Sequence, residues 1–178
     1  MRRTAELGFL LALALILSYV ESLIPFSFGI PGIKLGLPNL IVLLLLYEET
    51  GNADSEGTSV AGEIITKGAR EALLVNGMRI VLSGFLFSNL YAILYALSGA
   101  VLSFLAMLAG KKCSRFSMIG VSVLGGVFHN IGQMIVAVFV VETFAVAYYV
   151  PFLIAAGTVT GALLGLIGME LTPYLRRI

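Results

Sequence analysis

FSMIGVSVLGGVFHNIGQMIVAVFVVE, the sequence of residues 116–142, is almost free of charge and long enough to cross a lipid bilayer as a helix. His129, the only histidine of the chain, lies at mid-depth in this run. In a helix, Gln133 lies one turn after His129 on the same face, and Asn130 lies at the edge of that face. Polar atoms at this depth are costly unless other polar groups meet them. The run therefore predicts a membrane-spanning helix that carries a polar stripe.

The composition places the whole chain in the membrane class. Of its 178 residues, 59% are hydrophobic and 12% are charged, whereas soluble domains average about 25% charged. The net charge of +1, without a basic patch among exposed aromatic residues, argues against a nucleic-acid partner. One cysteine excludes a disulfide framework, and one histidine beside amides offers too few ligands for a metal. We expect one domain over residues 1–178, with no cofactor.

Apolar runs elsewhere in the chain predict the remaining helices at residues 4–23, 38–47, 69–88, 89–110 and 149–171. With residues 116–142 they give an all-α integral membrane protein, a six-transmembrane-helix bundle. Residues 24–39 are apolar but broken by prolines and glycines, and irregular backbone is not tolerated facing lipid. We therefore expect a lid or re-entrant loop there.

The basic residues predict the orientation of this bundle. With the N-terminus inside, the outer segments hold only Lys34, and all other basic residues at the ends of the spans lie inside. The positive-inside rule therefore places both termini in the cytoplasm and the lid-like loop on the outer side. Residues 48–68 hold half of the acidic residues and predict a polar cytoplasmic loop.

Arg79 is the most informative charge of the chain. It lies near the middle of its predicted span, where an arginine costs several kcal/mol unless it faces a cavity or a partner. By default such a residue marks a functional site, and snorkelling to the membrane surface is the alternative.

The first predicted helix carries small residues on two faces, Gly8 with Ala12 and Ala14 with Ser18. This spacing lets helices approach closely in lipid. It fits either packing inside the bundle or docking onto a partner membrane protein.

Four segments together resemble a known bacterial membrane family. They are LALALILSYVESLIPF (11–26), IPGIKLGLPNLIVLLLLY (30–47), REALLVNGMRIVLSGFLF (70–87) and IGVSVLGGVFHNIGQ (119–133). The family is known as heptaprenyl diphosphate synthase component I, or the Gx transporter family, and is similar to the substrate-binding S components of energy-coupling factor (ECF) transporters. Residues 48–68 are longer than the short turn expected in that family.

This resemblance implies a bundle in the bacterial inner membrane, surrounded by membrane lipid, that binds a small molecule from the outer side. A vitamin, a quinone or an isoprenoid precursor would fit. The bundle would dock onto a transmembrane coupling subunit driven by ATPase subunits, with Gly8, Ala12, Ala14 and Ser18 at the contact.

The residue pattern and the resemblance together predict the substrate site. Its members are Glu21, Lys34, Asn39, Arg79, Asn89, His129, Asn130 and Gln133. Arg79 and Lys34 would pair with an acidic group, and His129 and the amides would orient the substrate by hydrogen bonds. For His129, a hydrogen bond between helices is the alternative explanation.

Two other functions remain open. The first is a non-catalytic membrane subunit associated with heptaprenyl diphosphate synthase. Prenyl transfer needs aspartate-rich clusters that hold magnesium, and Asp54 is the only aspartate, so we do not expect an enzyme. The second, weaker alternative is an ion-coupled carrier, which would usually show internal repeats and carboxylates within the membrane.

Overall fold

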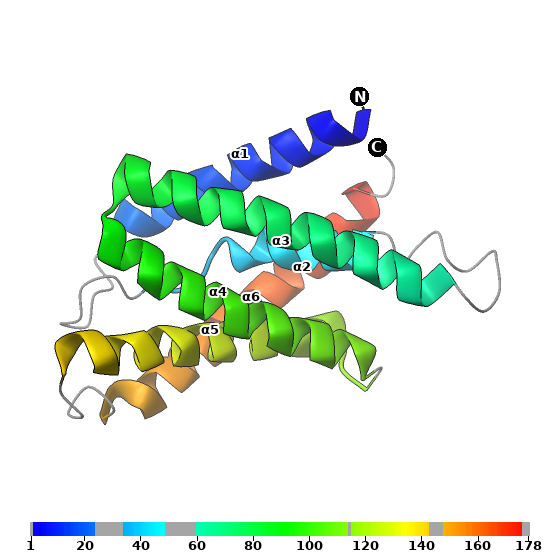
Figure 1. Ribbon diagram of the computed structural model, residues 1–178. Helices are drawn as coiled ribbons and strands as arrows, with labels where there is room; N and C mark the ends of the chain where they lie inside the picture. Colours follow the sequence, from blue (N-terminus) through cyan, green and yellow to red (C-terminus); the bar gives the residue numbers. More distant parts are fainter. Residues whose placement is uncertain (1, 24–33, 49–59, 114, 143–147, 176–178) are drawn as a thin grey trace.

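Six α-helices make up the computed structural model, which describes residues 2–23, 34–48, 60–113, 115–142 and 148–175 (Figure 1). They are α1 (Arg2–Leu23), α2 (Asn39–Glu48), α3 (Val60–Phe87), α4 (Leu90–Lys112), α5 (Met118–Val141) and α6 (Val150–Leu175). Within those residues there is no strand. The predicted all-α fold and its six helices are confirmed.

Four of these helices, α1, α4, α5 and α6, are long and apolar enough to cross a membrane. α2 has only 10 residues. α3 is long, but Asn76 and Arg79 in its middle reduce its apolar character. The described chain therefore has the character of a membrane protein, while six membrane crossings stay a prediction.

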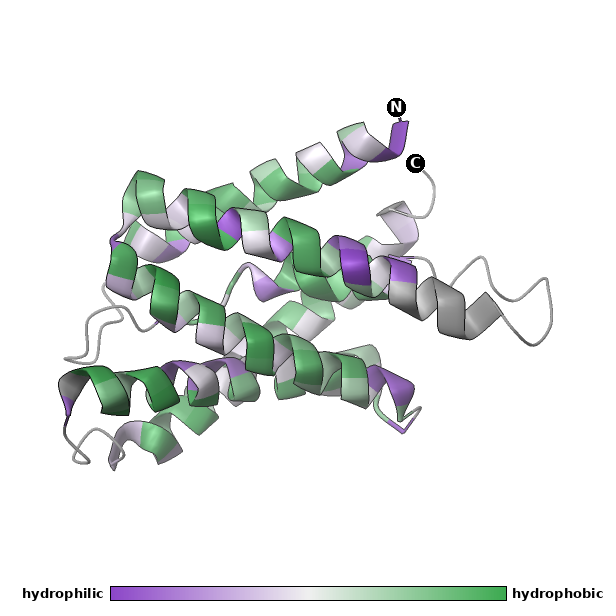
Figure 2. Cartoon of the chain, in the orientation of Figure 1, coloured by the Kyte–Doolittle hydropathy of each residue, from purple (hydrophilic) through white to green (hydrophobic). Residues whose placement is uncertain are grey.

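α2 is the centre of the bundle. All residues from Leu40 to Leu46 are buried, and α2 packs against each of the other five helices. A helix that is apolar on every side is stable only when it is enclosed. The outer helices instead expose large apolar side chains such as Phe85 and Phe139, as expected for surfaces in contact with lipid. Hydrophobic residues make up most of the length of these helices (Figure 2).

Glycines bring α5 close to both of its neighbours. A Cβ atom added at Gly132 would lie 2.8 Å from the Cα of Gly99 on α4. On the α6 side, a Cβ at Gly161 would lie 2.7 Å from the Cα of Val123, and one at Gly165 would lie 2.7 Å from that of Ile119. Small residues thus let the backbones of α4, α5 and α6 approach closely at these two contacts.

One end of the bundle is charged, the end at which α1 begins and α6 ends (Figures 1 and 2). There the Arg3 guanidinium binds Glu48 with an N–O distance of 2.6 Å, and it also binds Glu71 and Glu6. The Lys111 ammonium donates to the Leu46 carbonyl at the end of α2 and lies 4.9 Å from the centre of the Tyr47 ring. These contacts join α1, α2, α3 and α4.

The predicted polar loop at residues 48–68 needs a correction. Glu48 is the last residue of α2, and residues 60–68 belong to α3. The sequence prediction began this helix only at residue 69, where the longer apolar run starts, whereas residues 60–68, which include Glu63 and Lys67, belong to the same helix. Residues 49–59, and residues 24–33 of the lid-like loop, lie outside the described residues.

Candidate functional site

Polar side chains from four helices are buried near the middle of the bundle. Each is at most 6% exposed. They are Glu21 on α1, Asn39 on α2, Asn76 and Arg79 on α3, and His129, Asn130 and Gln133 on α5. We call Glu21, Asn39, Asn76, Arg79, His129 and Gln133 the polar cluster.

Glu21 holds the first loop where it turns into α2. Its Oε1 accepts hydrogen bonds from the backbone N–H groups of Gly36, at 2.5 Å, and Leu37, at 3.3 Å. Gly36 has a φ of 82°, a left-handed conformation that glycine adopts without strain. Two N–H groups converging on one carboxylate oxygen fix this loop segment over the polar cluster.

Gln133 and His129 continue the network on α5. The Lys34 backbone N–H donates to Gln133 Oε1 at 3.2 Å, which assigns the amide orientation. The Gln133 Nε2 then donates to His129 Nε2 at 3.1 Å, so the imidazole proton lies on Nδ1. The Gly99 backbone lies beside the imidazole and interacts with it electrostatically, while Nδ1 has no partner in hydrogen-bond geometry among the described residues.

Arg79 is buried with few partners. Its Nη2 donates to Asn76 Oδ1 at 2.5 Å, and its Nε has no hydrogen-bond partner in the part of the chain that the structure describes. Glu21 and Lys34 are near enough to interact with it electrostatically. Among the described residues, Arg79 forms no ion pair within 4.0 Å. The Arg79 side chain does not extend to the membrane surface, because it is buried inside the protein.

Lys34 lies at the edge of the polar cluster. Its ammonium donates to Ser88 Oγ at 3.2 Å. Burial lowers the pKa of this ammonium, and the nearby Glu21 carboxylate opposes the shift. Lys34 thus links the first loop to the connection between α3 and α4.

Two predicted site residues point elsewhere. Asn89 is exposed, and its Oδ1 accepts from the Ala92 N–H at 2.9 Å, so it caps α4. Asn130 donates through Nδ2 to the Leu153 carbonyl of α6 at 2.7 Å, which directs it away from α4. Neither belongs to the polar cluster.

The small residues of α1 divide between two environments. Gly8 and Ala12 are exposed, and a Cβ at Gly8 would meet nothing within 4 Å. Ala14 and Ser18 are buried in the bundle. In this structure only Gly8 and Ala12 are accessible to a partner.

The sequence reasoning left three neighbours out of the site. Asn76, one turn before Arg79, accepts its hydrogen bond, and the position of the two residues on one helix face was the available signal. Gly36 and Gly99 flank the imidazole: a Cβ at either would lie 2.9 Å from a ring atom of His129. No local pattern relates these two glycines to His129, because the contacts join distant segments.

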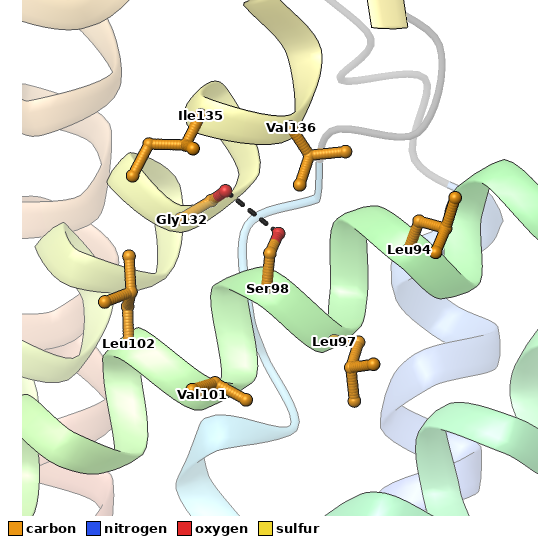
Figure 3. Close-up of a pocket in the computed structure, with 8 residues that line it drawn as sticks. All are labelled: Leu94, Leu97, Ser98, Val101, Leu102, Gly132, Ile135 and Val136. Atoms are coloured by element: carbon orange, nitrogen blue, oxygen red, sulfur yellow. Dashed lines mark hydrogen bonds between the residues drawn. The ribbon is translucent and has the colours of Figure 1, made fainter. Parts of the chain in front are cut away.

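An apolar groove of about 420 Å³ lies between α4 and α5 (Figure 3). Its one hydroxyl, Ser98 Oγ, donates to the Gly132 carbonyl at 2.9 Å and is therefore occupied. The other lining residues are Leu94, Leu97, Val101, Leu102, Ile135 and Val136. This groove can accept an apolar chain but offers no polar group for recognition, unlike the polar cluster.

The described residues contain no group of three His, Cys, Asp or Glu side chains that could hold a metal ion. The polar cluster has one carboxylate and one imidazole, and both make the hydrogen bonds given above. Its chemistry is therefore hydrogen bonding and charge recognition.

A family model described as heptaprenyl diphosphate synthase component I matches residues 10–54 and 58–171. This match includes every member of the polar cluster and most of each helix. No curated protein and no solved structure matches the chain.

Proposed function

The chain belongs to the heptaprenyl diphosphate synthase component I family, and on this premise we propose that it is the substrate-binding membrane component of an ECF-type transporter. It captures a small molecule from the outer side of the bacterial inner membrane for uptake. Both termini are cytoplasmic, and the loop segment 34–38 lies beside the site.

One observation carries this proposal. Polar atoms of Asn39, Arg79 and His129 are buried and have no hydrogen-bond partner among the described residues. Leaving such atoms unmet costs roughly 1–3 kcal/mol each, so a native protein retains them where something else satisfies them. A bound small molecule is the simplest such partner, and the first loop, held by Glu21, would enclose it.

Docking onto a transmembrane coupling subunit is the second part of the proposal. α1 packs only on α3 and α2 among the described helices. Its face with Gly8 and Ala12 is therefore free to contact another helix closely. Within the membrane such a contact is stabilised by packing and by hydrogen bonds rather than by the hydrophobic effect.

Purification of the tagged protein from its native host, after mild extraction, tests the proposal. We expect a transmembrane coupling subunit and ATPase subunits to co-purify, together with a retained small molecule detected by native mass spectrometry. The double variant Gly8→Leu/Ala12→Leu should lose the coupling subunit but keep the small molecule. Ala109→Leu adds a similar side chain at an exposed position of α4 and should keep both.

The family name favours a second candidate, a non-catalytic membrane subunit of heptaprenyl diphosphate synthase. The apolar groove between α4 and α5 suits a prenyl chain and gives this candidate a structural basis. In the same purification it requires a prenyl synthase subunit in place of the coupling subunit. That outcome, without a retained polar molecule, would refute the transporter proposal.

A further inference from the structure

Within the polar cluster, the buried side-chain atoms that lack a hydrogen-bond partner among the described residues are donors, while Asn130 Oδ1 and Ser18 Oγ lack one outside it. Arg79 Nε can only donate, Asn39 Nδ2 can only donate, and the His129 tautomer assigned above leaves an N–H on Nδ1. Three acceptors near them are already occupied: Asn76 Oδ1 by Arg79, Gln133 Oε1 by Lys34, and Glu21 Oε1 by the Gly36 and Leu37 N–H groups. These three donors therefore favour a ligand that brings acceptor oxygens of its own.

The charges of the same region also sum to a positive value. Lys34 and Arg79 are cationic and Glu21 is anionic, and the three interact electrostatically. His129, with its proton on Nδ1 alone, adds no charge. An uncompensated buried cation is costly, and a molecule with one negative charge would balance it.

We propose that the ligand of the polar cluster is a small anion, of the carboxylate or phosphate class, held by Arg79, Asn39 and His129, and that Glu21 positions the first loop and does not contact the ligand. This rests on the proposed function for the presence of a ligand, and it adds the chemical class and a different role for Glu21. The anion supplies acceptor oxygens for these donors. A neutral molecule could accept from the donors but would leave the positive charge unbalanced, and a cationic molecule would add to it.

The test uses the purified full-length chain in lipid nanodiscs and measures its thermal unfolding with added probes. The acidic probes are acetate, succinate and inorganic phosphate, and the neutral probes are acetamide and succinamide, all at equal ionic strength. We expect at least one acid to raise the unfolding midpoint and its amide counterpart to leave it unchanged. Equal effects of an acid and its amide, or no effect of any acid, would overturn the proposal.

Variants then assign the roles of the residues. Arg79→Gln should weaken binding of the effective acid about tenfold or more, as expected for loss of a charged hydrogen bond. Arg70→Gln removes the same charge from an exposed position of α3 and should leave the affinity unchanged. Equal effects of these two changes would show that Arg79 does not bind the anion.

Glu21→Gln gives the sharpest result, because the amide oxygen can still accept from Gly36 and Leu37 while the negative charge is removed. We expect the affinity for the acid to rise severalfold. A loss of affinity would mean that Glu21 contacts the ligand, and this would overturn the role proposed for it. The Glu21→Gln result can be interpreted even if the Arg79→Gln variant does not fold. The assay contains no coupling subunit. Anion binding can therefore be confirmed even if the proposed docking onto a coupling subunit is refuted.

Discussion

Gly36 is the residue at which the first loop, the polar cluster and α2 meet. Its N–H binds Glu21, its carbonyl accepts from the Asn39 N–H at 2.9 Å, and its Cα is packed against the imidazole of His129. Its left-handed φ allows the chain to make all three contacts at one position. The shape of the site near His129 therefore depends on the absence of a side chain here.

Gly36→Ala should destabilise the protein by about 2 kcal/mol, since it adds a left-handed penalty of roughly 1 kcal/mol to a steric clash. The new Cβ would lie 2.9 Å from His129 Cδ2 and 3.0 Å from Asn39 Nδ2. Thermal unfolding in detergent should show a midpoint lower by about 4 °C or more. Retention of the bound small molecule, followed by native mass spectrometry, should also fall.

Gly77→Ala is the matched control. Gly77 lies on α3 with open space around it, so a methyl group meets nothing within 4 Å. Alanine improves helix propensity by up to about 1 kcal/mol, and the midpoint should stay the same or rise. Similar losses in both variants would show that the turn at Gly36 has no special role.

The sequence identified the buried polar residues better than it identified their partners. Arg79, His129 and Gln133 were recognisable because a polar residue in mid-span is costly wherever the chain goes. Asn89 was indistinguishable from them, since an asparagine at the start of a helix serves equally well as a cap. Glu21 lies in the polar cluster, but its hydrogen bonds to the Gly36 and Leu37 backbone could not be predicted from the sequence.

At the scale of elements, α5 depends on close contact with α4 through Gly132. A Cβ there would lie 2.5 Å from the Ser98 carbonyl oxygen and 2.8 Å from the Gly99 Cα, both backbone atoms that cannot move aside alone. Gly132→Ala should therefore cost about 2 kcal/mol or more by forcing α4 and α5 apart, measured as a lower unfolding midpoint.

Gly120→Ala provides the comparison on the same helix. Its Cβ would meet only the Phe116 side chain, at 3.2 Å from Cδ1, and that ring is exposed and can turn. We expect a small change, below about 0.5 kcal/mol. If Gly120→Ala were as damaging as Gly132→Ala, loss of glycine flexibility rather than helix contact would explain both results.

The helices themselves were predictable to within a few residues, with one exception. Apolar runs end where α1, α4, α5 and α6 end, because those helices are apolar along nearly their whole length. α3 begins at Val60, well before its apolar part, since hydropathy detects burial and lipid contact and does not detect a polar helical extension. The central position of α2 could not be predicted from any local sequence pattern, because it depends on how the other helices pack around it.

At the scale of the whole molecule, Arg3 joins α1 to the rest of the bundle at its charged end. Its guanidinium binds carboxylates of α2 and α3, which adds to the packing of α1 on these two helices. Arg3→Gln should lower the unfolding midpoint by about 2–4 °C, which corresponds to roughly 1 kcal/mol. Amide hydrogen exchange should become faster in α1 and stay unchanged in α5.

Arg2→Gln is the control for that change. Arg2 pairs only with Glu6 among the described residues, and its side chain is 77% exposed, compared with 31% for Arg3. An exposed pair of this kind contributes little, so stability and exchange should be unaffected. Equal effects of the two variants would mean that the Arg3 contacts do not hold α1 in place.

The orientation of the whole molecule can be tested at Cys113, the single cysteine of the chain, which is exposed after α4 at the charged end. The positive-inside rule places this end in the cytoplasm. A membrane-impermeant maleimide should therefore label Cys113 only after intact cells are permeabilised. In a Cys113→Ser background, Tyr148→Cys puts a thiol at the opposite end, where Tyr148 is 88% exposed, and it should be labelled without permeabilisation. The reverse pattern would place the first loop and the polar cluster on the cytoplasmic side, and capture of a ligand from outside would then be ruled out.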